Sequence, residues 1–377
     1  MRGSGSVWGG VGCRIAATTA VGVLSAGCLL AGAGSATASG VLYAAVRARG
    51  TGDCWGWADA CTLSVALAEV AAGGVVELVT PSGTAHYKGN WSIATTGTSA
   101  RRPVTIQAWP GLSSAPVLDG NGGEPAGCAT ASCAGPVLTV PARTYVRVTA
   151  ITVTGADDAF GEGGGLLVSG SVIVTDCTFT GDQAGEGGAI DSGDGRHHFG
   201  SVTVTDSVFI GNGAGSGAAI DSGGDGGTGS LTVADSTFTG NSTAGAGGAI
   251  ASGSGGAGFV TVSGSTFTGN AAYDGGAIEN GLGGSGSVTV TDSSFRGNFA
   301  WIRGGAISNH AGSVRVMDST FTRNGPGSMW GEGGRSPTTP AAATSGGSSC
   351  RRPRSPATGP PRTARRSTTP TTADAGR

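Results

Sequence analysis

The fold of this chain is indicated by one stretch that it repeats, Val202-Thr203-Val204-Thr205-Asp206-Ser207-Val208-Phe209-Ile210-Gly211-Asn212. Four copies follow downstream and a looser copy precedes it; together they cover 172–182, 231–241, 260–270, 288–298 and 314–324. The phenylalanines of these copies are 30, 29, 29, 28 and 26 residues apart. A period in this range is typical of stacked architectures built from repeats.

Apolar and polar residues alternate within one repeat as they do in a β-strand. Val202 and Val204 share one face, and the threonines between them share the other. A second short strand is expected over 207–210, and a third at a Gly-Gly-Ala-Ile segment that recurs at 187–190, 247–250, 275–278 and 304–307, with Gly-Ala-Ala-Ile at 217–220. Such units bury a continuous apolar column only when they stack about 4.8 Å apart. The sequence therefore predicts an all-β parallel solenoid with three short strands per coil.

Two motifs in this repeat, Gly-Gly-Ala-Ile and Phe-x-x-Asn, resemble the repeat of the polymorphic outer membrane proteins. The larger class that the chain resembles is the pectate-lyase-like proteins, which implies a right-handed parallel β-helix. The resemblance covers 160–330 clearly and 75–330 more loosely, and it departs at Asp182 and at Gly217-Ala218. The structural repeat positions are Phe209/Asn212, Phe238/Asn241, Phe267/Asn270, Phe295/Asn298 and Phe321/Asn324.

Four regions are expected along the chain. Residues 1–39 resemble a secretory signal peptide, with Ala36-Thr37-Ala38 as the cleavage pattern; a retained membrane anchor or a lipoprotein is the alternative. Residues 40–74 contain a helix candidate over 62–72, ended by two glycines, that is expected to cap the first coil. The β-helix follows over 75–330, with its clear repeats over 160–330.

The last region, 331–377, is rich in Pro, Thr and Arg and has no strand pattern, so disorder is expected there. The switch occurs in the middle of a repeat, and the chain has a single Lys, Lys88, which suggests a GC-rich gene. An out-of-frame end is therefore one hypothesis for this tail. A basic segment that binds cell wall or another polyanion is the alternative.

Cysteine usage indicates an oxidising compartment. Cys54 with Cys61 and Cys128 with Cys133 are close pairs in loop-like sequence, and we expect two local disulfides. Cys177 occupies a serine position of the repeat and is expected to be a small buried thiol. Secretion, to the extracellular space or the cell surface, follows from these cysteines and from the signal peptide.

Acidic side chains are the main candidates for chemistry. Strand alternation places Asp191, Asp221 and Glu279 in one column on the outer face of the third strand, where carboxylates could share Ca²⁺. A solvated acidic face is the competing interpretation, and no other cofactor is expected. Arg196 lies in a loop close to Asp191 and is the nearest candidate for a catalytic base or cation. The asparagine column is expected to be structural, because a catalytic site needs one asymmetric cluster.

The function predicted from the sequence is that of an exported, non-enzymatic and monomeric surface scaffold or adhesin that binds carbohydrate or cell-wall polymer. A polysaccharide lyase or glycoside hydrolase of the same fold is the alternative, with Arg196, Asp191, Asp221 and Glu279 as its candidate site. Residues 40–334 contain 12 Lys and Arg against 23 Asp and Glu, a net charge of −11, which argues against nucleic acid as a partner. No transmembrane segment is expected once the signal peptide is removed.

Overall fold

The computed structural model describes residues 40–79, 85–120, 135–193, 199–224 and 226–326. Four expectations from the sequence lie outside these residues. They are the signal peptide, the Cys128–Cys133 disulfide, the role of Arg196 and the disordered tail.

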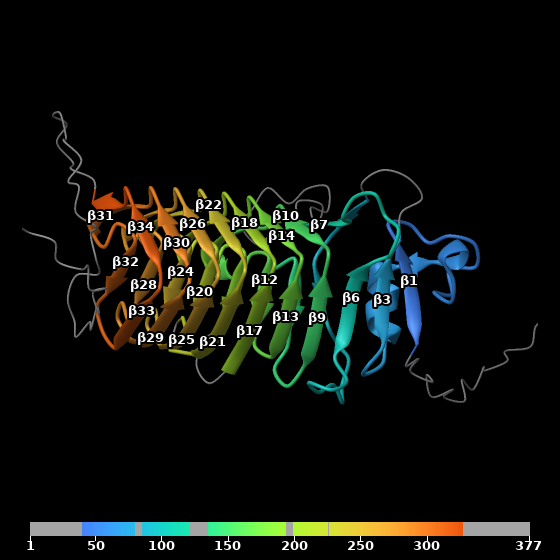
Figure 1. The fold of residues 1–377 in the computed structure, drawn as a ribbon. Coiled ribbons are helices and arrows are strands. Elements are labelled where there is room, and N and C mark those ends of the chain that lie inside the picture. The colour runs from blue at the N-terminus through green and yellow to red at the C-terminus, as the bar shows by residue number, and fades with distance from the viewer. Residues whose placement is uncertain (1–39, 80–84, 121–134, 194–198, 225, 327–377) are drawn as a thin grey trace, which may run out of the picture. The chain divides into compact units, whose positions relative to one another are not determined.

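The described chain is a parallel β-solenoid, as predicted (Figure 1). Strands of successive coils pair in parallel and in register, so that Val202, Val204 and Phe209 lie opposite Leu231, Val233 and Phe238. Each repeat contributes one strand to each of four sheets, named here I to IV in the order in which the chain of one coil visits them.

Sheet I has the longest strands. In its order along the stack it contains β2 (Cys61–Thr62), β1 (Val41–Ala45), β3 (Val75–Leu78), β6 (Val104–Ala108), β9 (Tyr145–Thr149), β13 (Ser171–Thr175), β17 (Phe199–Thr205), β21 (Thr228–Ala234), β25 (Ala257–Ser263), β29 (Ser285–Thr291) and β33 (Ser313–Met317). Sheet II contains β4 (His86–Lys88), β7 (Val117–Asp119), β10 (Thr152–Thr154), β14 (Thr178–Thr180), β18 (Val208–Ile210), β22 (Thr237–Thr239), β26 (Thr266–Thr268), β30 (Ser294–Arg296) and β34 (Thr320–Thr322).

Sheet III contains β11 (Asp157–Glu162), β15 (Gln183–Glu186), β19 (Gly213–Ser216), β23 (Ser242–Ala246), β27 (Ala271–Asp274), β31 (Phe299–Arg303) and β35 (Gly325–Pro326). Sheet IV contains β5 (Trp91–Ser92), β8 (Leu138–Val140), β12 (Leu166–Val168), β16 (Ile190–Ser192), β20 (Ile220–Ser222), β24 (Ile250–Ser252), β28 (Ile278–Asn280) and β32 (Ile307–Asn309).

Sheet III is the addition that the structure makes to the three predicted strands per coil. Several of its strands are short and rich in glycine and alanine, as in β19 (Gly213-Ala214-Gly215-Ser216), so they show little of the alternation and few of the β-branched residues that indicate a strand. Pairing with equivalent segments in the neighbouring coils supplies the order that local propensity does not.

The core is a column of stacked equivalent side chains. The rings of Phe179, Phe209, Phe238, Phe267, Phe295 and Phe321 stack in parallel, with 4.7–4.9 Å between successive centroids and 2–4° between their planes. This spacing is the distance between paired strands, so ring stacking and backbone pairing require the same geometry.

An asparagine ladder follows the phenylalanine column. Asn241 is fully buried, and its Oδ1 accepts hydrogen bonds from the backbone N and from Nδ2 of Asn212 at 3.0 Å. Its own Nδ2 donates to the Phe209 carbonyl at 3.1 Å and to the next rung, Asn270, at 2.9 Å. The same pattern continues through Asn298 to Asn324. Each buried amide thus satisfies backbone and side-chain groups of its neighbours.

Asp182 is the first rung of this ladder. Its backbone N donates to Asn212 Oδ1 at 3.0 Å, and its Oδ1 accepts from the Ala156 backbone N at 3.1 Å. Burial, and to a lesser degree the negative charge of Asp119, raise the pKa of Asp182 to about 8 against the lowering effect of the Ala156 hydrogen bond. The carboxyl therefore keeps its proton near neutral pH, while its Oδ2 has no hydrogen-bond partner among the described residues.

The bend between sheets I and II explains the aspartates of the repeat. Asp176, Asp206, Asp235, Asp292 and Asp318 all have φ between 45° and 54°, in the left-handed region that Asp tolerates better than most residues. Gly264 replaces Asp at this position in one coil and has φ 57°. The one departure from the aspartate column is therefore the residue that best tolerates the same backbone conformation.

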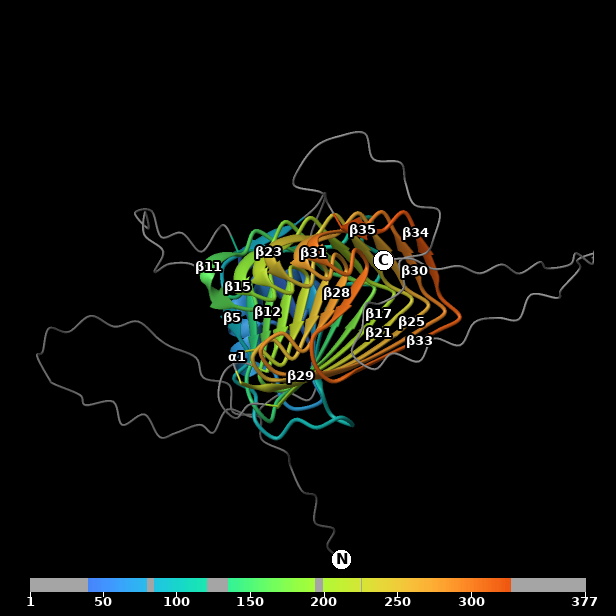
Figure 2. The same ribbon diagram turned by 90° about the vertical axis from the view of Figure 1, so that its left-hand side faces the viewer.

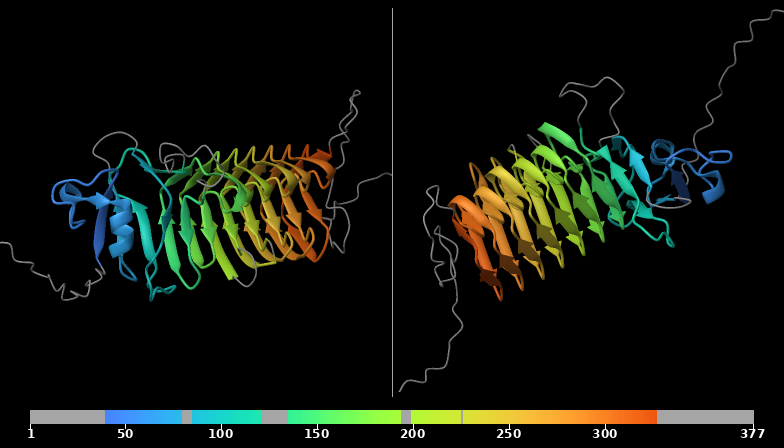
Figure 3. Two further views of the ribbon diagram at one scale, coloured as in Figure 1. Left: turned by 180° about the vertical axis from the view of Figure 1, so that it is seen from behind. Right: turned by 90° about the horizontal axis from the view of Figure 1, so that it is seen from above.

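The N-terminal end contains the predicted helix and disulfide. The helix α1 covers Leu63–Glu69, and its buried Leu63, Ala66 and Leu67 join the core beside β1 and β3 (blue in Figure 3). It ends before Gly73, because Val70 already has an extended conformation. The disulfide Cys54–Cys61 is confirmed and encloses a short 3₁₀ helix, η1 (Trp57–Asp59). In the described residues no helix has the length and hydropathy needed to cross a membrane.

The asparagine ladder predicts that replacing a single asparagine strongly lowers the stability of the fold. Asn270→Ala removes the hydrogen bonds of one buried amide to Asn241, Phe238 and Asn298 and leaves their polar groups unpaired. We expect a loss of about 3–5 kcal/mol in the free energy of unfolding. Chemical denaturation of Asn270→Ala beside the exposed control Thr266→Ala measures this. Equal midpoints for the two variants would show that the ladder contributes little.

Candidate functional site

Two neighbouring sheets, III and IV, contain the residues that depart from the repeat. Figure 2 shows these sheets as adjacent sides of the coils, with β31 and β28 labelled. Sheet III leads into sheet IV through the Gly-Gly turn of each repeat, where Gly275 has φ 65°. A side chain at Gly275 would meet the backbone of Ile278 and Glu279, so glycine is required for this tight corner.

The predicted acidic column is formed, but it is not exposed. Asp191 pairs with Asp221, and Ala251 pairs with Glu279, in adjacent strands of sheet IV. Asp221 and Glu279 have no exposed surface, and Asp191 is almost fully buried. The expectation of a solvated acidic face is therefore wrong.

Loops from the following turn cover this column. Gly224 lies over it, because a side chain there would meet the Glu186 carboxylate and approach Asp221. In the next coil Ser216 Oγ, at the end of β19, lies 3.1 Å from Ser254 Oγ in the loop after β24. The loops are linked to one another by bridges between Gly224 and Gly255 and between Ser254 and Gly283. The alternation of residues along a strand predicts on which face of the sheet a side chain lies. It does not predict that a loop covers that face.

Glu279 has a strongly raised pKa. Its carboxyl oxygens are buried, and the Leu282 backbone near them does not form a hydrogen bond of good geometry within the described part of the chain. Burial is the largest cause of its raised pKa, followed by the charges of Asp221 and Asp274, while the Leu282 backbone opposes them; the resulting pKa is about 9. Glu279 is therefore a neutral acid near pH 7.

A cluster of polar and charged side chains that does not follow the repeat lies beside Glu279. Asp274, at the end of β27, has one carboxylate oxygen 3.6 Å from Nε2 of His310 and the other 3.6 Å from Nε of Arg303. Asp274 is nearly buried and His310 is mostly buried, while Arg303 is exposed. Asp274 belongs to one coil, and Arg303 and His310 belong to two segments of the next coil, so no sequence motif indicates them.

The outer face of sheet III is aromatic at β27 and β31. Tyr273 is 50% exposed and Trp301 is 46% exposed, and each follows a buried alanine, Ala272 or Ala300. The Phe299 ring lies edge-on against Trp301, with 5.1 Å between centroids and 88° between planes, which restricts the indole. Since β27 pairs with β31, Tyr273 and Trp301 lie on neighbouring strands of one face.

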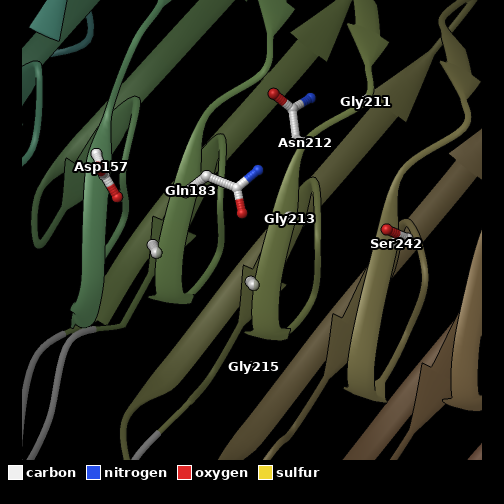
Figure 4. Close-up of a pocket in the computed structure, with 9 residues that line it drawn as sticks. Asp157, Gln183, Gly211, Asn212, Gly213, Gly215 and Ser242 are labelled. Carbon is white, nitrogen blue, oxygen red and sulfur yellow. The ribbon is translucent and has the colours of Figure 1, made fainter. Parts of the chain in front are cut away.

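A shallow polar depression continues the same face towards β11. Figure 4 shows Asp157, Gln183, Gly213 and Ser242 along its floor and sides, from β11, β15, β19 and β23. The Gln183 carboxamide extends over Gly213, since a side chain there would meet its oxygen and nitrogen. Glycine and small residues thus produce a hollow where bulkier residues stand in β27 and β31. We call this depression and the aromatic pair together the sheet III face.

The sequence-predicted site residues are only partly brought together. Asp191, Asp221 and Glu279 share the covered column, and Arg196 lies outside the described residues. Within the described ranges no group of three or more His, Cys, Asp or Glu side chains is placed to hold a metal ion, and calcium binding stays a prediction. Sequence reasoning missed Tyr273, Trp301, Asp274 and His310; the available signal was an aromatic residue shortly before two of the Gly-Gly turns.

Comparisons with known proteins do not identify a family for this chain. No family model matches the chain, and no curated protein matches it. Among solved structures, the crystal structure of an alginate lyase from Paenibacillus sp. str. FPU-7 is similar, with a TM-score of 0.39 and 15% identity over 74% of this chain and 98% of that chain. A similarity at this level carries no argument about what this chain does.

The buried position of Glu279 predicts a specific pH dependence. Its pKa is raised in the folded state, so the stability that it contributes is complete below about pH 4.5 and decreases as the pH rises to about 9. Over this window the contribution falls by about 1.4 kcal/mol per pH unit. Glu279→Gln mimics the neutral acid and removes this loss.

Denaturant unfolding of wild type and Glu279→Gln between pH 5 and 10 tests this. The stability difference in favour of Gln should grow up to about pH 9 and then level off, while Asp182 contributes equally to both proteins. If the free energies of unfolding of the two proteins differ by the same amount at every pH, the raised pKa of Glu279 is contradicted.

Proposed function

We propose that this chain is an exported scaffold that binds a carbohydrate polymer on the sheet III face. The observation that carries the proposal is that exposed Tyr273 and Trp301 lie next to a polar, glycine-lined depression on one sheet. The informative feature is an aromatic pair beside a polar depression, because single exposed apolar residues such as Phe259 are normal on a folded protein.

The chemistry of this face suits sugars. Sugar rings present C–H faces that pack on aromatic planes and hydroxyls that hydrogen-bond to polar side chains. Tyr273 and Trp301 offer rigid amphipathic contact area at low entropic cost. Gln183, Ser242 and Asp157 offer donors and acceptors along the same strands. Because the strands are stacked at about 4.8 Å, these groups form a track that an extended polymer can follow.

Secretion fits the same function. The Cys54–Cys61 disulfide is consistent with an oxidising compartment, where cell-wall and extracellular polysaccharides are found. The regular solenoid provides a rigid support on which several weak sugar contacts can act together.

A polysaccharide lyase or glycoside hydrolase is the second candidate. It is favoured by the group formed by Asp274, His310 and Arg303, which occurs once in the described coils and lies at the end of the strands that carry the aromatic pair. An acid, an imidazole and a cation next to a sugar-binding face are the elements of acid–base chemistry.

Removing the aromatic pair tests the proposal. We expect Tyr273→Ala with Trp301→Ala to weaken binding of soluble xylan, β-glucan or polygalacturonate at least 10-fold, because two stacking contacts of about 1 kcal/mol each are lost. Affinity electrophoresis of the full chain measures this for each polymer. The matched control is Phe259→Ala, an exposed aromatic residue on sheet I.

An equal loss in Phe259→Ala, or no loss in the double variant, would contradict binding on the sheet III face. The same samples can be assayed for new reducing ends and for absorbance of unsaturated uronides. Product formation by wild type that is lost in His310→Ala would favour the enzyme over the scaffold.

A further inference from the structure

A second aromatic surface lies far from the sheet III face, in the loop closed by the Cys54–Cys61 disulfide. Trp55 is 64% exposed and Trp57 is 55% exposed, the former among the most exposed large apolar side chains that the structure describes. Both indoles belong to a segment of eight residues, 54–61, whose ends are covalently joined. We call residues 49–61 the tryptophan loop.

The tryptophan loop is held rigidly. Cys54 donates through its backbone N to the Asp59 carbonyl at 3.1 Å, and its own carbonyl accepts from Tyr43 N of β1 at 2.9 Å. The Asp59 carboxylate accepts from Thr51 N at 2.9 Å, and the Asp53 carboxylate accepts from Trp55 N at 3.1 Å. These bonds fix the backbone on both sides of the indoles, so little conformational entropy remains to be lost on binding.

The charges around the indoles limit the ligand chemistry. The guanidinium of Arg49 lies 5.3 Å from the ring centre of Trp57, within cation–π distance, and its Nη1 donates to the Trp57 carbonyl at 3.5 Å. Asp53 and Asp59 balance the charge of Arg47 and Arg49. A surface without net positive charge is poorly suited to nucleic acid or to an anionic membrane. Planar rings beside fixed polar groups suit a neutral ligand with apolar faces and hydroxyls.

We propose that the tryptophan loop is a second carbohydrate-binding site, which takes sugar units of the same polymer as the sheet III face. The ligand class rests on the proposed function, while the site itself rests on the rigid, exposed indoles. Along sheet I, eight strand spacings separate β1 from β29, the strand of the coil that contains Trp301, or about 40 Å at about 4.8 Å each. One long polymer can bridge this distance, whereas a short oligosaccharide cannot.

Two linked sites predict a length dependence. Simultaneous contact raises the affinity for a long polymer above that of either site alone by up to a factor of 10²–10⁴. Loss of either site then lowers the affinity for the polymer strongly, but leaves binding of a short oligosaccharide at the other site unchanged. A merely structural role of the tryptophans would not produce this difference.

The experiment is a four-protein comparison on the full chain: wild type, Trp55→Ala/Trp57→Ala, Tyr273→Ala/Trp301→Ala, and all four substitutions together. Each is titrated with soluble xylan, β-glucan and polygalacturonate and with short oligosaccharides of each. Trp109→Ala is the matched control, and Trp55→Tyr/Trp57→Tyr retains the planar rings. Thermal unfolding confirms that each variant is folded.

The expected result is a 10- to 100-fold loss of polymer affinity in Trp55→Ala/Trp57→Ala, partial recovery with the tyrosines and no change in Trp109→Ala. Unchanged polymer affinity in Trp55→Ala/Trp57→Ala, with a loss in Tyr273→Ala/Trp301→Ala, would overturn the second site alone. A loss confined to Trp55→Ala/Trp57→Ala would overturn the sheet III face and keep the tryptophan loop. Absence of binding by wild type would overturn both.

Discussion

The structure depends on one constraint: each coil must repeat the backbone of the coil before it, in register. Backbone pairing, phenylalanine stacking and the asparagine ladder all operate at the same spacing, so each one enforces the others. A residue that faces the interior is therefore restricted to what its equivalents in neighbouring coils allow. The variations follow the same rule, since Gly264 keeps the backbone bend of the aspartates and Asp182 keeps the hydrogen bonds that link the asparagines to the backbone of neighbouring coils.

Side chains that point outward are free of this constraint. We therefore look for function where outward residues differ from their equivalents in neighbouring coils. The sheet III face arises because β19 is built of small residues, with Gly213 in the row where β31 has Phe299, while β27 and β31 carry Tyr273 and Trp301. The covered acidic column differs from the sheet III face in that a ligand cannot reach it. Its carboxyls are closed off from solvent by glycine-rich loops, so Asp221 and Glu279 cannot touch a polymer, and Glu279 acts on stability. The groups that a ligand can reach are those above the column, Arg303 among them.

The repeating features could be predicted from the sequence because they recur in it. The spacing of Phe209 and its equivalents predicted stacked coils, and the short separation of Cys54 and Cys61 predicted their disulfide. Two features could not be predicted. Strands of sheet III such as β19 have no local strand signal, since they are ordered by their neighbours. The burial of Glu279 depends on loops that fold over sheet IV, a tertiary effect that alternation along a strand does not contain.

The central claim is that carbohydrate binds to particular faces of an otherwise regular solenoid. Hydroxyl-radical footprinting by mass spectrometry, with and without a bound polymer, reports the exposure of each aromatic side chain in one experiment. We expect protection of Tyr273, Trp301, Trp55 and Trp57 and unchanged oxidation of Phe199 and Phe259 on sheet I, which are exposed in the free protein. Protection of Phe199 and Phe259 with no change at Tyr273 and Trp301 would contradict it.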